Sequence, residues 1–398
     1  MSRTDLIQRL AQRQSERARN GLLRRLRTVE AIDSTTIILA GQRLCSFASN
    51  DYLGLAAHPD LRQALIEAAR DWGVGATAAH LLGGHRAVHA ELEEELADWT
   101  GRERALLFST GFMANLGVTD ALLKYGESCV QDRLNHASLL DGARLSGAHL
   151  KRYPHLDMDG AARQLARSTA TPTLLASDAV FSMDGDIAPL SQLADLGARY
   201  QATLLIDDAH GLGVLGEQGA GSLIAAGLPA TQVPILMATL GKALGVCGAF
   251  VAGSAELIEG LGQFSRPYIY TTAMPPALAA ASLAAVRLAR GADERRENLQ
   301  RRITQFRHGA QQLGLALLDS STPIQPLWVG EAATALAWSQ ALEKAGFYVP
   351  AIRPPTVAVG QARLRVALSA QHDYTEVEQL LDALADLARS TAPLTGEN

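Results

Sequence analysis

The stretch Val233–Phe250, VPILMATLGKALGVCGAF, contains one charge, Lys242, between an apolar run and a glycine-rich exit. Its segment Ile235–Ala238 is a short apolar run between turn-forming residues, which predicts a buried strand. Lys242 would then lie where the strand leaves the core. Two interpretations remain open. The lysine either keeps its head group in water, or is a desolvated amine whose lowered pKa lets it attack a carbonyl.

Composition restricts the class of protein. The chain has 398 residues, 47% of them hydrophobic, so we expect a soluble, well-cored protein of two or three domains. A net charge of −5 argues against nucleic acid as a partner. No apolar run reaches the roughly 18 residues of a membrane span. The three cysteines show no CxxC spacing, which favours a reducing cytoplasm and predicts no metal site.

The first 27 residues form a basic segment. They carry eight arginines against Asp5 and Glu16, with leucines at roughly helical spacing. A transit peptide has a similar arginine content, but the acidic residues and the lack of a serine-rich tract argue against it. We expect an arm that docks on a partner subunit.

Strands alternate with helices through the middle of the chain, which predicts a mostly parallel sheet covered by helices on both faces. Ligands in such sheets bind beyond the carboxyl ends of the strands. The expected strands are Ala105–Phe108, Ser128–Gln131, His149–Tyr153, Thr173–Ala176, Thr203–Ile206 and Ile235–Ala238.

A shift to charged residues after Gly291 predicts a domain boundary. We therefore expect an N-terminal helical arm with short strands over residues 1–55 and a large domain over 56–290. A smaller C-terminal α+β domain would follow over 291–398. In that domain we expect strands near Leu315–Leu318, Ile324–Val329, Tyr348–Ile352 and Arg363–Ala367.

The segment Thr203–His210, TLLIDDAH, is an apolar strand that ends in two carboxylates and a histidine. Neighbouring strand residues face opposite ways, so only one of Asp207 and Asp208 can face a given ligand. The following GLGVLG, residues 211–216, formally matches a dinucleotide-binding fingerprint. However, two acids stand where a pyrophosphate would bind, and no acid about 20 positions on would hold a ribose.

Asp207 and Lys242 together fit pyridoxal phosphate better. This cofactor is an electron sink while its ring nitrogen stays protonated, which needs a buried carboxylate, and a lysine holds its aldehyde. The two residues end separate strands, 35 positions apart.

The cofactor's other groups also find candidates. Ser109–Met113, which includes Gly111 and Phe112, joins a strand to a helix and offers backbone N–H groups for a phosphate. His136 starts a helix, where it could stack on the cofactor ring or serve as a capping or core histidine. The residues that could bond the cofactor's oxygens are Ser182, His210 and Thr239.

Seven motifs between Leu22 and Leu384 stand in one family's order. The chain resembles the α-oxoamine synthases, which are pyridoxal-phosphate enzymes of the aspartate-aminotransferase fold (type I). That fold has a mixed, mostly parallel sheet between helices and a smaller C-terminal α+β domain. The motifs are SNDYLGL (49–55), ALLFSTGFMAN (105–115), DRLNHASLLDGARLS (132–146), VFSMDGDIAPL (180–190), DDAHGLGVLGEQG (207–219), TLGKALG (239–245) and AIRPPTV (351–357).

The resemblance assigns roles to residues. It implies that Lys242 holds the cofactor and acts as the base, that Asp207 pairs with the pyridinium, and that His136 stacks on the ring. Thr271 and Thr272 match a segment that reaches the neighbouring subunit's phosphate, which implies a homodimer with active sites at its interface. Further cofactor contacts are Gly111, Phe112, Ser182, His210 and Thr239, and the substrate residues are Arg24, Asn50, His136, Arg353 and Thr356.

The implied reaction is a decarboxylative condensation. AIRPPTV resembles the branch that joins L-alanine to a pimeloyl thioester in biotin synthesis. Arg353 would hold a substrate carboxylate through two parallel bonds, and Arg24 the far carboxylate of the pimeloyl chain, unless Arg24 is only a solvated helix charge. Whether the acyl group arrives on coenzyme A or on acyl carrier protein stays open.

Three alternative functions remain. The chain could use glycine or serine, like the relatives that make aminoketobutyrate, aminolaevulinate or ketosphinganine. It could be an NAD-dependent dehydrogenase or a non-catalytic cofactor-binding regulator. The chain also departs from the family pattern in GATAAHLLGG (75–84), where Ala79 and His80 replace small hydroxylated or glycine residues, and at Ala358, where proline is usual.

Overall fold

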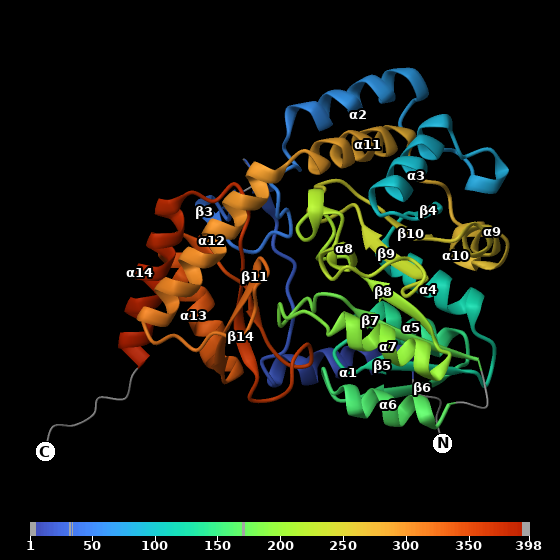
Figure 1. Ribbon diagram of the computed structural model, residues 1–398. Helices are drawn as coiled ribbons and strands as arrows, with labels where there is room; N and C mark the ends of the chain where they lie inside the picture. Colours follow the sequence, from blue (N-terminus) through green and yellow to red (C-terminus); the bar gives the residue numbers. More distant parts are fainter. Residues whose placement is uncertain (1–4, 32, 34, 169–171, 392–398) are drawn as a thin grey trace, which may run out of the picture.

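The computed structural model describes residues 5–31, 33, 35–168 and 172–391, so the first four residues of the predicted arm and the last seven residues of the chain lie outside it. A seven-stranded sheet forms the centre, in the order β4-β10-β9-β8-β7-β5-β6 (Figure 1). Its strands are β4 (Arg104–Phe108), β5 (Ser128–Asp132), β6 (His149–Tyr153), β7 (Thr173–Asp178), β8 (Thr203–Asp207), β9 (Ile235–Thr239) and β10 (Ala249–Gly253).

The predicted mixed, mostly parallel sheet is confirmed. β5 to β9 pair in parallel, whereas β10 is antiparallel to both β4 and β9. β10 was not predicted, because its apolar run AFVAG directly follows the glycine-rich exit and no polar residue separates the two. Its insertion completes the sheet between the first strand and the strand that precedes Lys242.

Helices cover both faces of this sheet. Side chains alternate along β4, so Leu106 and Phe108 pack with α4 and α5, whereas Leu107 packs on the opposite face with α3. α6 and α7 cover that opposite face over β7 and β8. These helices are α3 (Ala87–Trp99), α4 (Gly111–Leu122), α5 (Ala137–Leu145), α6 (Met158–Ala166) and α7 (Leu190–Tyr200).

Shorter helices and two long ones complete this part of the chain. α2 and α11 lie side by side over α3 at the top of Figure 1. The elements are α2 (Pro59–Trp72), η1 (His80–Leu82), η2 (Glu217–Gly219), α8 (Ser222–Ala225), α9 (Ala255–Phe264), α10 (Arg266–Ile269) and α11 (Pro276–Arg290).

The two ends of the chain meet in a second region with two small sheets. β12, near the C-terminus, pairs in parallel with the N-terminal β3. Leu315–Leu318 was predicted as a strand, but it makes only one bridge, from Leu317 to Leu327. The strands are β1 (Val29–Ala31), β2 (Thr36–Leu39), β3 (Gln42–Ser46), β11 (Ile324–Gly330), β12 (Phe347–Tyr348), β13 (Ala351–Ile352) and β14 (Ala362–Ala367).

Three helices flank these sheets (Figure 1). The charged boundary segment forms α12 (Asp293–Gln312), and α13 (Ala332–Lys344) and α14 (Tyr374–Thr391) pack near it. The N-terminal helix α1 (Leu6–Arg19) has no buried residue. Within the described residues, no helix combines the length and the apolar character that crossing a bilayer requires.

A histidine ties two loops together at the carboxyl edge of the central sheet. His155 Nδ1 lies 3.1 Å from Asp132 Oδ1 at the end of β5, and its Nε2 lies 2.8 Å from Asp186 Oδ2. Burial lowers the pKa of His155, but the bonds to both carboxylates outweigh it and raise the pKa to about 10. The imidazolium therefore bridges two acids.

We predict that His155→Gln lowers the free energy of unfolding by about 1–3 kcal/mol at pH 6, because both acids lose a charged donor. The folded-state pKa of about 10 lies above that of an unfolded histidine, roughly 6.5. The stabilisation is therefore complete below about pH 6.5 and disappears as the pH rises through about 10. Urea unfolding at pH 6, 8 and 10 measures this.

The exposed His149, varied to Gln, is the matched control and should change little at any pH. A His155→Gln deficit that is equally large at pH 6 and pH 10 would contradict the ion-pair explanation.

Candidate active site

A cavity of about 180 Å³ opens at the carboxyl ends of β7, β8 and β9. Because these strands are parallel neighbours, their last residues lie along one edge of the sheet. The cavity brings together most of the predicted cofactor and catalytic residues: Gly111, Phe112, His136, Ser182, Asp207, His210, Thr239 and Lys242.

Asp207 faces this cavity and is 5% exposed. Its Oδ2 accepts a bond from Asn115 Nδ2 (2.7 Å) and its Oδ1 one from the Ala209 N–H (3.0 Å). These two bonds fix the orientation of the carboxylate in the cavity. Asp208 instead accepts two bonds from Ser222, and burial raises its pKa to about 7. As strand alternation requires, the two side chains point in different directions, Asp207 into the cavity and Asp208 toward Ser222.

Lys242 enters the same cavity from the turn after β9. Its Nζ lies 2.7 Å from His210 Nε2. Burial lowers the pKa of Lys242 to about 8, although the neighbouring Asp207 and Asp178 act in the opposite direction. Of the two interpretations of this lysine, the structure supports the desolvated amine.

His136 is a helix cap, which is one of the roles that the sequence left open. It precedes α5 as its N-terminal cap, with Nδ1 2.7 Å from Ser138 Oγ, and its backbone N–H donates to Asp178 Oδ2 (2.8 Å). Its ring also lines the cavity, edge-on to Phe112 at a centroid distance of 6.3 Å. The cap fixes the position of the ring.

Sequence reasoning missed three polar residues of the site. Asp178 ends β7 beside Asp207 and is 4% exposed, and burial together with Asp207 raises its pKa well above the usual range. Arg365, 5% exposed, donates to the Ser182 carbonyl (2.7 Å). Asn115 was quoted only as part of a motif. A charge inside an apolar strand was the available signal for Arg365 and Asp178.

A larger hollow of about 690 Å³ leads from the surface to this cavity and shares His136, Ser182, His210 and Lys242 with it. We call this hollow the entrance. Of the predicted substrate residues it is lined by Arg24, Asn50, His136 and Thr356, and also by Arg133 and Arg365.

The remaining predicted residues lie outside both hollows. Arg353 is not among the lining residues, and its Nη1 donates to the Gly21 carbonyl (2.7 Å). Thr272 is exposed and forms a bridge with Ala79. In the divergent loop His80 is buried and stacks on Tyr268 at 5.0 Å, so it has a packing role.

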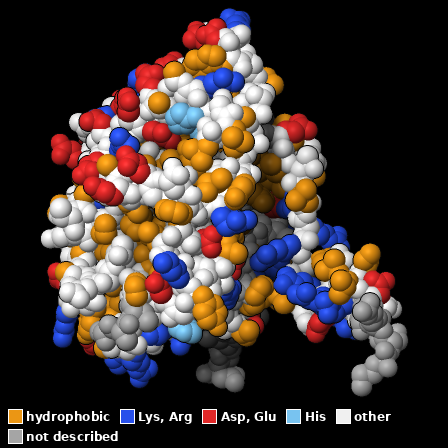
Figure 2. Space-filling model, turned by 90° about the vertical axis from the view of Figure 1, so that its right-hand side faces the viewer, with side chains coloured by type: hydrophobic (Ala, Val, Ile, Leu, Met, Phe, Trp, Pro, Cys, Tyr) orange, Lys and Arg blue, Asp and Glu red, His pale blue; other side chains and the backbone are white. Residues whose placement is uncertain are grey.

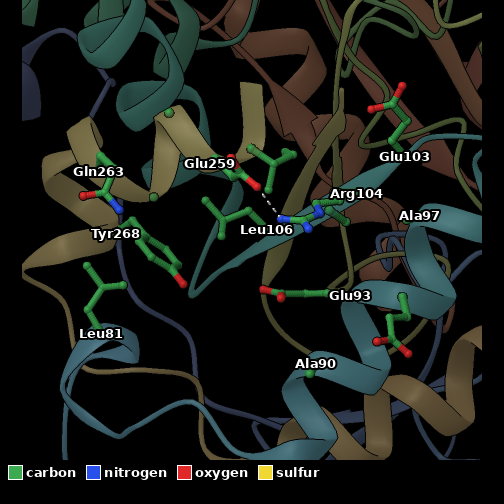
Figure 3. A pocket seen from close by; sticks show the side chains of 15 residues that line it. Leu81, Ala90, Glu93, Ala97, Glu103, Arg104, Leu106, Glu259, Gln263 and Tyr268 are labelled. Carbon is green, nitrogen blue, oxygen red and sulfur yellow. Dashed lines mark hydrogen bonds and ion pairs between the residues drawn. The ribbon is translucent and has the colours of Figure 1, made fainter. Parts of the chain in front are cut away.

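Another hollow, also of about 690 Å³, lies between α3, α9 and β4 (Figure 3). Burial raises the pKa of its Glu93 to about 8, and this carboxyl accepts the Leu107 N–H (2.9 Å). Arg104 and Glu259 form an ion pair there (2.9 Å). None of the predicted site residues lines this hollow. We therefore place the active site in the cavity at the carboxyl ends of β7, β8 and β9.

The cavity residues fit pyridoxal phosphate. An amine and a carboxylate face one space, and α4 begins beside it at Gly111, where Thr110 caps the Met113 N–H (3.2 Å). The buried Asn115 Oδ1 has no hydrogen-bond partner among the described residues. A polar, phosphorylated ring has matching groups at each of these points.

Comparison with known proteins agrees with this geometry. Residues 43–384 match the aminotransferase class I and II family. An 8-amino-7-oxononanoate synthase of Cellvibrio japonicus is 53% identical over 387 residues, covering 97% of each chain. One of Pseudomonas putida is 54% identical over 377 residues, 95% of this chain and 96% of the other.

Solved structures are similar over nearly the whole chain. Serine palmitoyltransferase of Sphingomonas wittichii has 29% identity and a TM-score of 0.92, covering 97% of this chain and 99% of its own. A serine palmitoyltransferase structure with pyridoxal phosphate has 28% identity and a TM-score of 0.91, with the same coverage. The 8-amino-7-oxononanoate synthase of Francisella tularensis has 29% identity and a TM-score of 0.77, covering 87% of this chain and 98% of its own.

We predict that Lys242 titrates near pH 8 in the cofactor-free protein, because burial disfavours its charged form. The chain has four lysines, of which Lys124 and Lys344 are exposed references. Competitive labelling with fluorodinitrobenzene across pH 6–11, read by peptide mass spectrometry, measures each apparent pKa. A Lys242 profile that coincides with both references would contradict the desolvated amine.

Proposed function

Because the chain belongs to the aminotransferase class I and II family, we propose that it is a pyridoxal-phosphate enzyme that condenses L-alanine with a pimeloyl thioester. The products are 8-amino-7-oxononanoate, a precursor of biotin, together with carbon dioxide and the free thiol. One observation carries the proposal. Lys242 and Asp207 face a single cavity in a chain that is 51–54% identical to 8-amino-7-oxononanoate synthases.

When bound, pyridoxal phosphate supplies an electron sink for the electron pair left on the alanine Cα. We assign Lys242 to its aldehyde and Asp207 to its ring nitrogen, because Lys242 supplies the amine of the cavity and Asp207 is a carboxylate there whose two oxygens both accept hydrogen bonds. His136 would cover the ring. The residues assigned to its phosphate and ring oxygens are Gly111, Phe112, Thr239, Ser182 and His210.

Lys242 acts as the base that takes the proton from the alanine Cα. With its pKa lowered to about 8 by burial, a substantial fraction of the amine is unprotonated near neutral pH. The neighbouring His210 accepts a bond from the protonated amine at 2.7 Å, which stabilises the product of that proton transfer.

Arg365 is the residue best placed to hold the alanine carboxylate. It is almost fully buried at the entrance, and its bonds to the Ser182 carbonyl and to Asn50 Oδ1 (3.1 Å) fix the guanidinium plane. A planar guanidinium can then present parallel N–H donors to a carboxylate. Arg353 does not contact the alanine carboxylate in this assignment. It donates to the Gly21 carbonyl and so positions the arm that carries Arg24.

Arg24 lies at the outer part of the entrance, where it donates to Thr356 Oγ1 (3.0 Å), and we assign it to the far carboxylate of the pimeloyl chain. Two bonds between Arg27 and Glu343, of 2.6 and 2.7 Å, fasten this segment to α13. The acyl chain would therefore lie between Arg24 and Arg365, both of which line the entrance.

The acyl donor arrives on an acidic acyl carrier protein. Lys and Arg side chains gather over the protruding lower right part of Figure 2, where α1 lies. The helix carries Arg9, Arg13, Arg17 and Arg19 but only one acid, Glu16, and ends five residues before Arg24. A basic surface beside the entrance favours a negatively charged protein partner.

The enzyme works as a homodimer in the cytoplasm. Thr271 and Thr272 are at least partly exposed, beside the Ala79 bridge, in a position from which a second copy could use them. α1 has apolar side chains without cover, among them Leu6 and Leu10 at 67% and 64% exposure. Free Cys45, Cys129 and Cys247 fit a reducing compartment.

We predict that the holoenzyme consumes a pimeloyl thioester with L-alanine and yields 8-amino-7-oxononanoate, detected by its mass. Glycine and serine should give at most about 1% of the alanine rate, a discrimination of roughly 3 kcal/mol. Activity with glycine alone would contradict the choice of branch. A protein that binds pyridoxal phosphate but catalyses no condensation would favour the regulator. A colourless protein that binds NAD would favour the dehydrogenase.

The same assay, run with coenzyme A and carrier-protein donors side by side, tests the partner. The basic arm favours a higher kcat/KM for the carrier-borne donor at low ionic strength, with the advantage shrinking as salt is added. Equal salt dependence for both donors would contradict carrier docking.

We predict that Arg365→Lys raises the KM for alanine about 10- to 100-fold, because a lysine cannot make two parallel bonds to a carboxylate. The KM for the acyl thioester should change less than about threefold. Arg353→Lys is the matched control and should leave the KM for alanine nearly unchanged, since Arg353 contacts the arm. Steady-state kinetics with each substrate varied in turn distinguishes the two variants. A raised KM for alanine in Arg353→Lys but not in Arg365→Lys would show that Arg353 binds the alanine carboxylate.

A further inference from the structure

A chain of hydrogen bonds leads from Lys242 to Arg365 through three side chains. Lys242 Nζ lies 2.7 Å from His210 Nε2, and His210 Nδ1 lies 2.7 Å from Tyr52 Oη. Tyr52 Oη donates to Asn50 Oδ1 (3.1 Å), which also accepts a bond from Arg365 Nη2 (3.1 Å). Tyr52, which is fully buried, belongs to SNDYLGL and has no role in the mechanism described above.

The direction of each bond follows from the end of the chain. Arg365 has only donors, so Asn50 must present its carbonyl oxygen, and that oxygen can only accept. If Tyr52 gave its single proton to His210, the oxygens of Tyr52 and Asn50 would face each other at 3.1 Å without a proton between them. Tyr52 therefore donates to Asn50 and offers His210 a lone pair. His210 must then carry its own proton on Nδ1, because two acceptors cannot face each other at 2.7 Å.

His210 has one ring proton to place. Burial and the nearby Lys242 lower its pKa well below the usual range, so the imidazole is neutral. With the proton on Nδ1, Nε2 is an acceptor that faces Lys242 Nζ. In this tautomer Nε2 can accept a hydrogen bond from the protonated amine, which has only donors.

We propose that Tyr52 is a positioning residue that fixes His210 in the tautomer whose Nε2 accepts a bond from the Lys242 ammonium, and so sets how tightly Lys242 holds a proton. The inference rests on the proposed function only in taking Lys242 as the catalytic base. The tautomer itself follows from the bonds and does not depend on the substrate.

Other charges also act on Lys242, and they stay in place when only the Tyr52 hydroxyl is removed. The carboxylates at the ends of β7 and β8 favour its protonated form, and the guanidinium on β14 opposes it. His136, at the start of α5, also lies within electrostatic reach. The groups concerned are Asp178, Asp207, Asp208, Arg365, His136 and His210.

Tyr52→Phe should reverse the tautomer. The Nδ1–H of His210 would face an apolar ring without an acceptor, so the proton moves to Nε2. An Nε2–H can donate to a neutral amine but cannot accept from an ammonium. The charged form of Lys242 then loses its partner, and the apparent pKa of Lys242 falls by about one pH unit.

The test is competitive labelling of the cofactor-free protein, which needs no activity. In Tyr52→Phe the Lys242 profile should move about one pH unit lower, while the exposed Lys124 and Lys344 stay fixed. Tyr268→Phe, which also removes a hydroxyl from a buried tyrosine, is the matched control and should not move Lys242. An unchanged or raised apparent pKa of Lys242 in Tyr52→Phe overturns the proposal.

A second variant covers the case in which the buried Tyr52 does not tolerate substitution. Asn50→Ala removes the acceptor of the Tyr52 proton, which then turns to His210 Nδ1 and forces the same tautomer change. The partly exposed Asn50 makes this change milder for folding, and it should shift Lys242 in the same direction. In a His210→Ala background neither variant should shift Lys242 further, and an undiminished shift there overturns the proposal.

Activity adds a separate readout in the holoenzyme. If the condensation occurs, the acidic limb of the kcat/KM profile should move down with the labelling profile in Tyr52→Phe. If the wild-type holoenzyme catalyses no condensation, the proposed function is contradicted. The labelling experiment then still decides whether Tyr52 sets the tautomer of His210. An acidic limb that stays in place while Lys242 shifts overturns the link between Tyr52 and the base.

Discussion

The structure depends on holding a buried carboxylate and a partly buried amine at one edge of a parallel sheet. Asp207 ends β8 and Lys242 follows the neighbouring β9, so strand pairing alone brings them to one cavity. Removing both charges from water is costly unless hydrogen bonds replace the solvent. Asn115 and the Ala209 N–H supply them to the carboxylate, and His210 supplies one to the amine. Asp178 adds a second buried acid at the same edge.

Both ends of the chain complete this site. SNDYLGL contributes Asn50 and Tyr52, and β14, more than 300 residues later, contributes Arg365 to the same hydrogen-bond chain. The pairing of β3 with β12 fixes these distant segments in one region. The central sheet therefore supplies the buried charges, and the region built from the two termini supplies the groups that orient a substrate and tune the base.

Much of this arrangement could be predicted from the sequence. Alternating apolar runs predicted the strands of the central sheet, and polar residues after those runs predicted the cavity. Local patterns did not reveal β10, whose apolar run merges with the preceding glycine-rich turn. Arg365 was missed because its role comes from the direction in which β14 faces, and that direction depends on packing between regions far apart in the chain. The tautomer of His210 likewise could not be predicted from the sequence, because it follows from hydrogen-bond distances that only the structure provides.

The mechanism requires that Lys242 and Asp207 face a single cofactor ring. Reducing the pyridoxal-phosphate-loaded protein with borohydride and mapping the added mass among its four lysines tests it most directly. We expect the added group on Lys242 alone, with weaker capture in Asp207→Asn. Attachment at Lys124, Lys151 or Lys344 instead, or capture that is indifferent to Asp207, would contradict it.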